Sequence, residues 1–248
     1  MIVLLPPSES KWNRPRGRAA DPTSWSFPEV KAARDELAAA LAEASARDDA
    51  LTVLGVSAGL ADEVARNLRL STAPATPAAE VYTGVLYDAL GLATLDPASL
   101  RRARRMIVIM SALRGAVRLG DRITAYRLTA GTDLPGIGRP ETWWSRRLSP
   151  VLAEHAGRGV IVDCRSGGYV PMWRPTGDQA KKWVHVKVPG ASHMAKHTRG
   201  LVARALVELP TTPRSVGATA DALSASFDVK LIDPSRAGQP WTLEVTAP

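Results

Sequence analysis

The stretch DPASLRRARRMIVIMS (residues 96–111) decides the fold class, because it reads as a helix that leads straight into a buried strand. Asp96 followed by Pro97 is a typical helix start, an N-cap residue with proline in the first turn. The arginines at positions 101–105 complement the dipole at the end of this helix and need no ligand. The apolar run from Met106 to Met110 is typical of a short strand in the centre of a sheet.

The same alternation of helix and strand extends along the whole chain. We expect further strands at Ile2 to Leu5, Ile123 to Leu128, Val160 to Asp163, Trp183 to Val188, and near 227–232 and 241–246. Helices are expected at 28–48, 57–70, 141–155 (kinked or split at Pro150), 192–209 and 217–226. Interleaved elements of this kind predict an α/β fold with a mixed β-sheet core and surrounding helices. We expect a single domain over residues 1–248, in which helices within 28–75 can form a subdomain.

The composition indicates an anionic partner. The chain has 248 residues, is 45% hydrophobic and 23% charged, and carries a formal net charge of +8. Seven of its 32 basic residues are lysines, so the excess is mostly arginine, the better bidentate ligand for phosphate. A basic excess favours nucleic acid, a nucleotide or an anionic membrane surface as partner, without choosing among them.

The cysteine count and the apolar runs exclude several classes of protein. A lone Cys164 excludes an intramolecular disulfide, a dithiol redox pair and a cysteine-rich zinc site. The apolar start at Ile2 to Leu5 ends at two prolines, and no stretch approaches the roughly 20 apolar residues of a membrane span. We therefore expect a cytoplasmic protein with no membrane partner and no cofactor, whose oligomeric state the sequence leaves open.

Two short segments suggest where function lies. The loop PPSESK (residues 6–11) directly follows the first strand, and residues 11–18 continue as a basic arm or a solvated surface loop. LPGIG (residues 134–138) resembles the hairpin of a helix-hairpin-helix module, whose backbone amides bind a DNA phosphate. The segment before it reads as a strand, which favours a plain tight turn. The common dinucleotide and P-loop sequences are absent.

The helix at 192–209 has one apolar and one basic face. The apolar face holds Met194, Leu201, Val202, Ala205, Leu206 and Leu209; the opposite face holds His193, Lys196, His197 and Arg204, with Arg199 at its edge. Gly200 lies in the basic face, although glycine costs a helix up to about 1 kcal/mol. A phosphate group or a crossing segment would explain a close approach there; the alternative is a solvated face with an incidental glycine. His193 and His197 have the spacing of metal ligands, but no neighbouring acid or cysteine completes a set, and we expect no metal.

Several ordered motifs resemble one known family. YTG (82–84), SALRGAVRLGD (111–121) and YRL (126–128) closely resemble the YaaA family of bacterial peroxide-stress proteins. The pattern continues with the aromatic pair at 143–144, with Ser166 and Tyr169, and with AKHTRG (195–200). The motifs follow the family order from residue 1 to about 205, with Arg114 where the family prefers tyrosine.

The resemblance implies both a fold and a function. It implies an unusual α/β fold with a positively charged cleft, and a helix-hairpin-helix-like element corresponding to residues near 56–69. It implies a cytoplasmic protein that lowers oxidative DNA damage under hydrogen peroxide, limits unincorporated iron and binds double-stranded DNA.

Our first hypothesis is a DNA-binding protein of oxidative-stress defence that binds nonspecifically or by DNA structure. The residues expected to contact phosphates are Lys11, Arg118, Arg127, Lys196 and Arg199, with Gly115 and Gly200 allowing close approach of the backbone. An open groove of duplex width would favour this hypothesis.

The alternative is an enzyme acting on a nucleotide or nucleobase. Its polar pocket would contain Ser8, Tyr82, Ser111, Ser166 and Tyr169, with Asp121, Lys196, Tyr126 and Ser8 as candidate catalytic residues. Asp121 would be the base, unless it only pairs with Arg118 or Arg127 and pins the sheet. A deep closed pocket would favour the enzyme. A third hypothesis, an iron-binding protein, rests on His193, His197 and the iron phenotype of the family.

Overall fold

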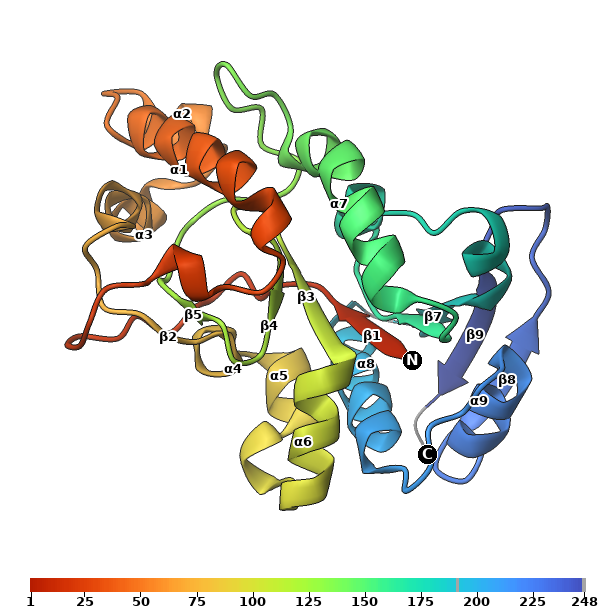
Figure 1. Ribbon diagram of the computed structural model, residues 1–248. Helices are drawn as coiled ribbons and strands as arrows, with labels where there is room; N and C mark the ends of the chain where they lie inside the picture. The colour runs from red at the N-terminus through yellow and green to blue at the C-terminus, as the bar shows by residue number, and fades with distance from the viewer. Residues whose placement is uncertain (191, 247–248) are drawn as a thin grey trace.

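A seven-stranded mixed sheet forms the centre of the protein, as the computed structural model shows for residues 1–190 and 192–246 (Figure 1). Its strands are β1 (Ile2–Leu5), β3 (Ile107–Ser111), β4 (Gly115–Arg118), β6 (Ile161–Asp163), β7 (Trp183–Lys187), β8 (Asp228–Ile232) and β9 (Trp241–Thr246). Their order is β4-β3-β1-β6-β7-β9-β8. The strands from β3 to β9 in this order are parallel, and the two edge strands are antiparallel. The expected α/β class with a mixed sheet is therefore confirmed.

Helices cover both faces of this sheet. They are α1 (Lys31–Ser45), α2 (Ala50–Val53), α3 (Ala61–Arg66), α4 (Ala78–Val81), α5 (Val85–Leu90), α6 (Pro97–Met106), α7 (Pro140–Ala156), α8 (Ser192–Glu208) and α9 (Val216–Leu223). Figure 1 shows α7 on one side of the sheet, α5, α6 and α8 on the other, and α1 to α3 gathered near the β4 edge. A separate two-stranded sheet pairs β2 (Thr76–Pro77) with β5 (Arg122–Ile123). Within the described part of the chain, no helix is both long and apolar enough to cross a membrane.

The deciding stretch folds as its sequence predicts. The Asp96 carboxylate accepts hydrogen bonds from the amides of Ala98 (2.8 Å) and Ser99 (3.1 Å), which starts α6. Every residue of β3 is buried, and Arg102 near the end of α6 donates to the Val207 carbonyl. The arginine run thus has a structural role at this end of the helix.

Other elements differ from the expectation in informative ways. Of the segment expected as a strand at 123–128, only Ile123 pairs with another strand. Further along, the backbone amide of Arg127 donates to the Asn67 side chain instead of to a neighbouring strand. The segment after Ser111, where no strand was expected, contains β4. Pro150 lies inside α7 without ending it. The region 57–70 divides into α3 and two short 3₁₀ turns, Ala58–Leu60 and Asn67–Arg69.

The LPGIG segment is a plain tight turn. The Leu134 amide donates to the Gly138 carbonyl (3.1 Å), and the Gly138 amide donates back to Leu134 (2.8 Å). Residues 124–133, directly before it, form no helix, so it lacks one half of a helix-hairpin-helix module.

Candidate functional site

A cavity of about 490 Å³ lies at the carboxyl ends of β1 and β6. The loop after β1 supplies residues 6–10, the loop after β6 supplies Ser166 and Tyr169, and the start of α5 forms another wall. From β1 the sheet continues to β3 on one side and to β6 on the other. A crevice outside the carboxyl ends of parallel strands, at such a switch point, is the usual ligand site of an open α/β sheet. Its volume is in the range of small-molecule sites.

The cavity carries two cations of α8 that have no acidic partner. Lys196 is exposed and Arg199 is half-buried, one turn apart, and both line the cavity. Arg199 Nε donates to the Val186 carbonyl (3.2 Å). Neither residue forms an ion pair with any acidic side chain of residues 1–190 or 192–246. The exposed Glu9 is the acidic residue in the lining. This charge arrangement favours an anionic ligand.

A buried hydroxyl cluster lies next to the loop after β1. Tyr126 Oη lies 2.7 Å from Ser111 Oγ and 3.3 Å from Tyr82 Oη. Burial raises the pKa of both Tyr82 and Tyr126, so the two phenols stay protonated at neutral pH. The structure therefore brings Tyr82, Ser111 and Tyr126 together, although none of them lines the cavity.

Lys11 connects this cluster with the cavity. Its Nζ lies 4.5 Å from the centroid of the Tyr126 ring and donates to the carbonyls of Ser8 (2.7 Å) and Glu9 (3.2 Å). Burial, followed by the charge of Arg127, lowers the pKa of Lys11 from 10.5 to about 7. A substantial fraction of this amine is therefore unprotonated near neutral pH. The lysine holds the cavity loop in place through the Ser8 and Glu9 carbonyls, although its own side chain is not part of the cavity lining.

Ser8 fixes the same loop against α5. Its hydroxyl oxygen accepts a hydrogen bond from the Thr83 amide (3.0 Å) and donates to the Ser10 carbonyl. Tyr87 Oη, from α5, donates to the Pro6 carbonyl (2.7 Å). Thr83 and Gly84 of the YTG motif thus form part of the cavity wall, whereas Tyr82, the residue expected in the pocket, lies behind it.

Arg127 lies outside the cavity lining. Its Nη1 contacts Glu63 at 3.4 Å, with both side chains largely buried. The guanidinium is therefore partly neutralised by a carboxylate, and it acts on the site mainly through its charge near Lys11.

The two glycines expected to admit a phosphate are instead packed by protein. A Cβ at Gly200 would overlap the Leu86 carbonyl oxygen and lie 2.8 Å from Ala89 Cβ. The crossing segment is therefore α5, and this corrects the assignment of Gly200 to phosphate binding. Gly115, at φ +73°, lies under the Trp144 ring, where a Cβ would come within 2.9 Å. Its position is likewise set by packing.

Arg118 and Asp121 lie away from the cavity. Because β4 runs antiparallel to β3, Arg118 pairs with Val108 at the amino end of β3, whereas the cavity lies at the carboxyl ends of its neighbours. Asp121 is buried and accepts hydrogen bonds from the amides of Ser26 (3.1 Å) and Arg118 (2.8 Å). Asp121 therefore stabilises the turn after β4. This is the structural role considered for it above, but it acts through backbone amides and not through an ion pair with Arg118 or Arg127.

The two histidines of α8 lie in different surroundings. His193 lines the cavity, whereas Nδ1 of His197 is buried without a partner. Over the residues that the structure describes, no three His, Cys, Asp or Glu side chains gather in an arrangement that could hold a metal ion.

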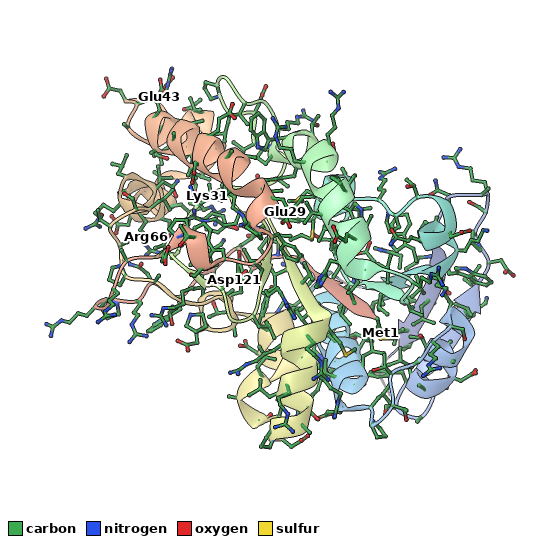
Figure 2. The ribbon with its side chains drawn as sticks, viewed as in Figure 1. Met1, Glu29, Lys31, Glu43, Arg66 and Asp121 are labelled. Atoms are coloured by element: carbon green, nitrogen blue, oxygen red, sulfur yellow. The ribbon has the colours of Figure 1, made fainter. Side chains whose placement is uncertain are left out.

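A separate pocket, the basic hollow, lies beside the basic arm at residues 11–18. It is lined by Asn13, Arg14, Pro15, Arg66, Arg69, Thr72, Ala73, Pro74 and Ala125. The Ala75 amide donates to the Arg18 carbonyl, which ties the arm to this side of the protein. Figure 2 shows Arg66 on the side of the molecule farthest from β8. The charge run in the sequence predicted the basic arm. It did not indicate that the arm lies beside Arg66 and Arg69.

Comparisons with known proteins agree over most of the chain. The family model described as "Peroxide stress protein YaaA" matches residues 1–220. A UPF0246 protein of Streptomyces coelicolor is 43% identical over 254 residues, covering 99% of this chain and 98% of the relative. A UPF0246 protein of Corynebacterium efficiens is 40% identical over 89% of this chain and 91% of the relative. The chain belongs to the peroxide stress protein YaaA family.

Proposed function

We propose that this protein binds double-stranded DNA in the cytoplasm and so protects it from peroxide damage. The observation that carries the proposal is the pair of cations, Lys196 and Arg199, at the carboxyl edge of the sheet, which form no ion pair within residues 1–190 and 192–246. Phosphate contacts from such side chains provide most of the affinity in nonspecific DNA binding. One backbone phosphate would lie between these two side chains.

The basic hollow extends this surface beyond a single phosphate. Ser10 lines the cavity and Asn13 lines the hollow, and three residues span at most about 10 Å of chain. Phosphates of one DNA strand follow each other at about 3.4 Å of helix rise, so a few nucleotides would reach from one to the other. Arg14, Arg66 and Arg69 would then contact the neighbouring phosphates. Contacts of this kind orient DNA without reading its sequence.

A salt series tests the number of phosphate contacts. With five contacts, from Lys196, Arg199, Arg14, Arg66 and Arg69, log K against log salt should fall with a slope of about −4.5 in a duplex mobility-shift or fluorescence assay. Lys196→Met and Arg199→Met should each reduce the magnitude of that slope by about 0.9. Lys230→Met, on the edge strand β8, is the matched control and should leave the slope unchanged.

Two results would refute DNA binding at this surface. One is the absence of binding at low salt. The other is a slope that stays the same in Lys196→Met, Arg199→Met and Lys230→Met alike. Protection is tested separately by counting strand breaks in plasmid exposed to ferrous iron and peroxide. The wild type should reduce the breaks, whereas the double variant of Lys196 and Arg199 should not.

The Lys11 amine favours a second candidate, an enzyme acting on a nucleotide or nucleobase. The cavity is large enough for such a ligand, and Lys11, with a pKa of about 7, can accept a proton near neutral pH. Lys196 and Arg199 would hold the phosphate. Nucleotides should then raise the melting temperature of the wild type. Lys11→Met should keep that binding and lose product formation measured by mass spectrometry. If no nucleotide raises the melting temperature, this candidate fails.

A further inference from the structure

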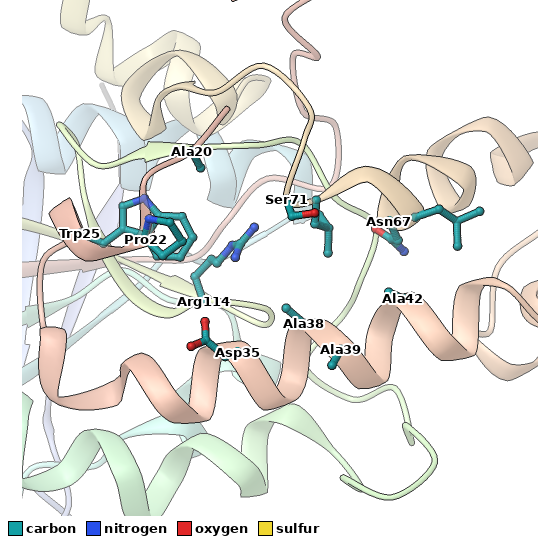
Figure 3. Close-up of a pocket in the computed structure, with 12 residues that line it drawn as sticks. Ala20, Pro22, Trp25, Asp35, Ala38, Ala39, Ala42, Asn67, Ser71 and Arg114 are labelled. Atoms are coloured by element: carbon teal, nitrogen blue, oxygen red, sulfur yellow. The ribbon is translucent and has the colours of Figure 1, made fainter. Parts of the chain in front are cut away.

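A second cavity lies between α1 and the segment at residues 67–71, away from the cavity described above (Figure 3). Its volume is about 360 Å³. The lining is mostly apolar: Ala20, Pro22, Trp25, Ala38, Ala39, Ala42, Leu68 and Leu70, with Asp35, Asn67, Ser71 and Arg114 as the polar residues. None of these residues takes part in the DNA surface proposed above.

The cation of this cavity is Arg114. Its side chain is 4% exposed, and Figure 3 shows its guanidinium reaching into the space between Trp25 and Ser71. Nη2 makes one long hydrogen bond to Thr124 Oγ1 (3.3 Å), and Nε is buried without a partner. The guanidinium lies 4.5 Å from the centroid of the Trp25 ring. In the described part of the chain, no carboxylate lies within ion-pair distance of Arg114.

A second buried cation adds to the positive charge behind the cavity. Arg34 is 1% exposed, donates to the carbonyls of Ser26, Arg114 and Ala116, and leaves its Nη1 without a partner. Burial lowers the pKa of Arg34 and of Arg114 to about 10, so both remain protonated at neutral pH. Within the described residues neither guanidinium forms an ion pair, and the charges of Asp121 on Arg34 and of Asp35 on both act from beyond ion-pair distance. This arrangement is costly, because a charge taken out of water needs a close counter-charge.

The acidic residue that faces this cavity is already paired. Asp35 Oδ2 lies 2.6 Å from Lys31 Nζ, and both side chains are about half-exposed. Asn67 is also fully occupied, since its amide group bonds to Ser45, to the Arg127 carbonyl and to the Arg127 amide. The Arg114 donors therefore call for a hydrogen-bond acceptor that carries negative charge. The walls next to them favour a ligand whose remaining atoms are apolar.

We propose that this cavity binds a small organic carboxylate, with its oxygens on Arg114 and its apolar body against Trp25 and the alanines of α1. A carboxylate matches the planar guanidinium and supplies the missing charge. A single negative charge suffices. The apolar walls offer a multiply charged phosphate too few donors.

The test follows the Trp25 indole N–H in two-dimensional NMR of the full chain, with Trp25→Phe to assign its signal among the seven tryptophans. Sodium benzoate is the probe, and benzamide, inorganic phosphate and sodium chloride at equal ionic strength are the comparisons. Benzoate should shift the signal saturably, and the three comparison solutes should not. Arg114→Met should weaken benzoate binding about tenfold or more, the usual effect of losing a charge-assisted pair.

Two further variants make the outcome decisive. Arg147→Met removes another guanidinium stacked on a tryptophan, 3.4 Å from the Trp143 centroid, and should leave benzoate binding unchanged. Ala38→Leu narrows the cavity from the partly exposed face of α1, keeps Arg114, and should also abolish binding, so it decides the case if Arg114→Met does not fold. Equal shifts with benzoate and benzamide, unchanged binding in Ala38→Leu, or a response to phosphate alone would overturn the proposal. DNA binding by Ala38→Leu should equal that of the wild type, which separates this site from the DNA surface.

Discussion

The crossing of α5 over α8 predicts that Gly200→Ala destabilises the protein. The added Cβ would overlap the Leu86 carbonyl oxygen and lie 2.8 Å from Ala89 Cβ. The first obstacle is backbone, so no rotamer change can relieve it, and the two helices must move apart. Inside an ordinary helix the same substitution would stabilise, because alanine has the higher helix propensity.

The two opposing effects give the expected magnitude. Overpacking of a close-packed contact costs roughly 1–3 kcal/mol, and a backbone obstacle puts Gly200 at the upper end of this range. The gain in helix propensity offsets up to about 1 kcal/mol. The net loss should therefore be about 2 kcal/mol, which lowers the melting temperature of a chain of this size by about 4–8 °C.

Urea denaturation followed by circular dichroism, together with calorimetry, measures this loss. Gly217→Ala in α9 is the matched control, because a Cβ at that position meets open space, and it should leave stability unchanged or slightly raised. If Gly200→Ala is as stable as Gly217→Ala, the packing explanation of Gly200 is wrong. A loss of DNA affinity without a loss of stability would instead restore the assignment of Gly200 to phosphate binding.

Three further predictions concern buried ionisable groups. Asp163→Asn removes the carboxylate from a fully buried ion pair with Arg165 (2.6 Å) and should cost about 3–5 kcal/mol in urea denaturation, whereas Asp178→Asn, in an exposed pair, should have no measurable effect. Cys164 is fully buried, and burial raises its pKa to about 12, so Ellman's reagent should label it only as the protein unfolds; rapid labelling of native protein would contradict this. The lowered pKa of Lys11 means that the unfolded chain binds more protons between pH 7 and 10, so the stability of the wild type relative to Lys11→Met should rise across that interval; a difference independent of pH would disprove it.

The uninterrupted apolar runs predicted the centre of the sheet correctly. β1, β3 and β6 are buried on both faces, and such strands read as continuous apolar segments. β7 was predicted from its alternation instead, with His185 half-buried and Lys187 exposed. β4 was missed because its four residues, GAVR, carry no such signal; its pairing with β3 through a tight turn makes it a strand. The strand expected at 123–128 failed for the opposite reason. Its apolar alternation is real, but the Arg127 amide is bonded by Asn67 rather than by a neighbouring strand.

The residues of the candidate site were predictable only in part. Ser8, Ser166, Tyr169, Lys196 and Arg199 meet because loops that follow parallel strands emerge at one edge of the sheet. The direction of β4 could not be derived from the sequence, so the sequence did not separate Arg118 and Asp121 from the residues that line the cavity.

The helix wheel of α8 was similarly limited. It placed Met194 on an apolar face, yet this side chain is 53% exposed, whereas Gly200 is buried. Periodicity gives the angle between side chains, but it does not show which turn of a helix another element covers.

The arginines fall into two groups, those that connect parts of the fold and those available to a ligand. The net charge counts both groups alike. Arg34, Arg102 and Arg204 donate to backbone carbonyls of distant segments, so their guanidinium groups connect parts of the fold. Each of these three occupies an Nη group with carbonyls, and a guanidinium held in this way releases no counterion when DNA binds, whereas Arg199 bonds a carbonyl through Nε. The salt dependence of DNA binding should therefore follow the few cations at the cavity and at the basic hollow. A chain with the same net charge but without Lys196 and Arg199 would keep its basic character and lose the site.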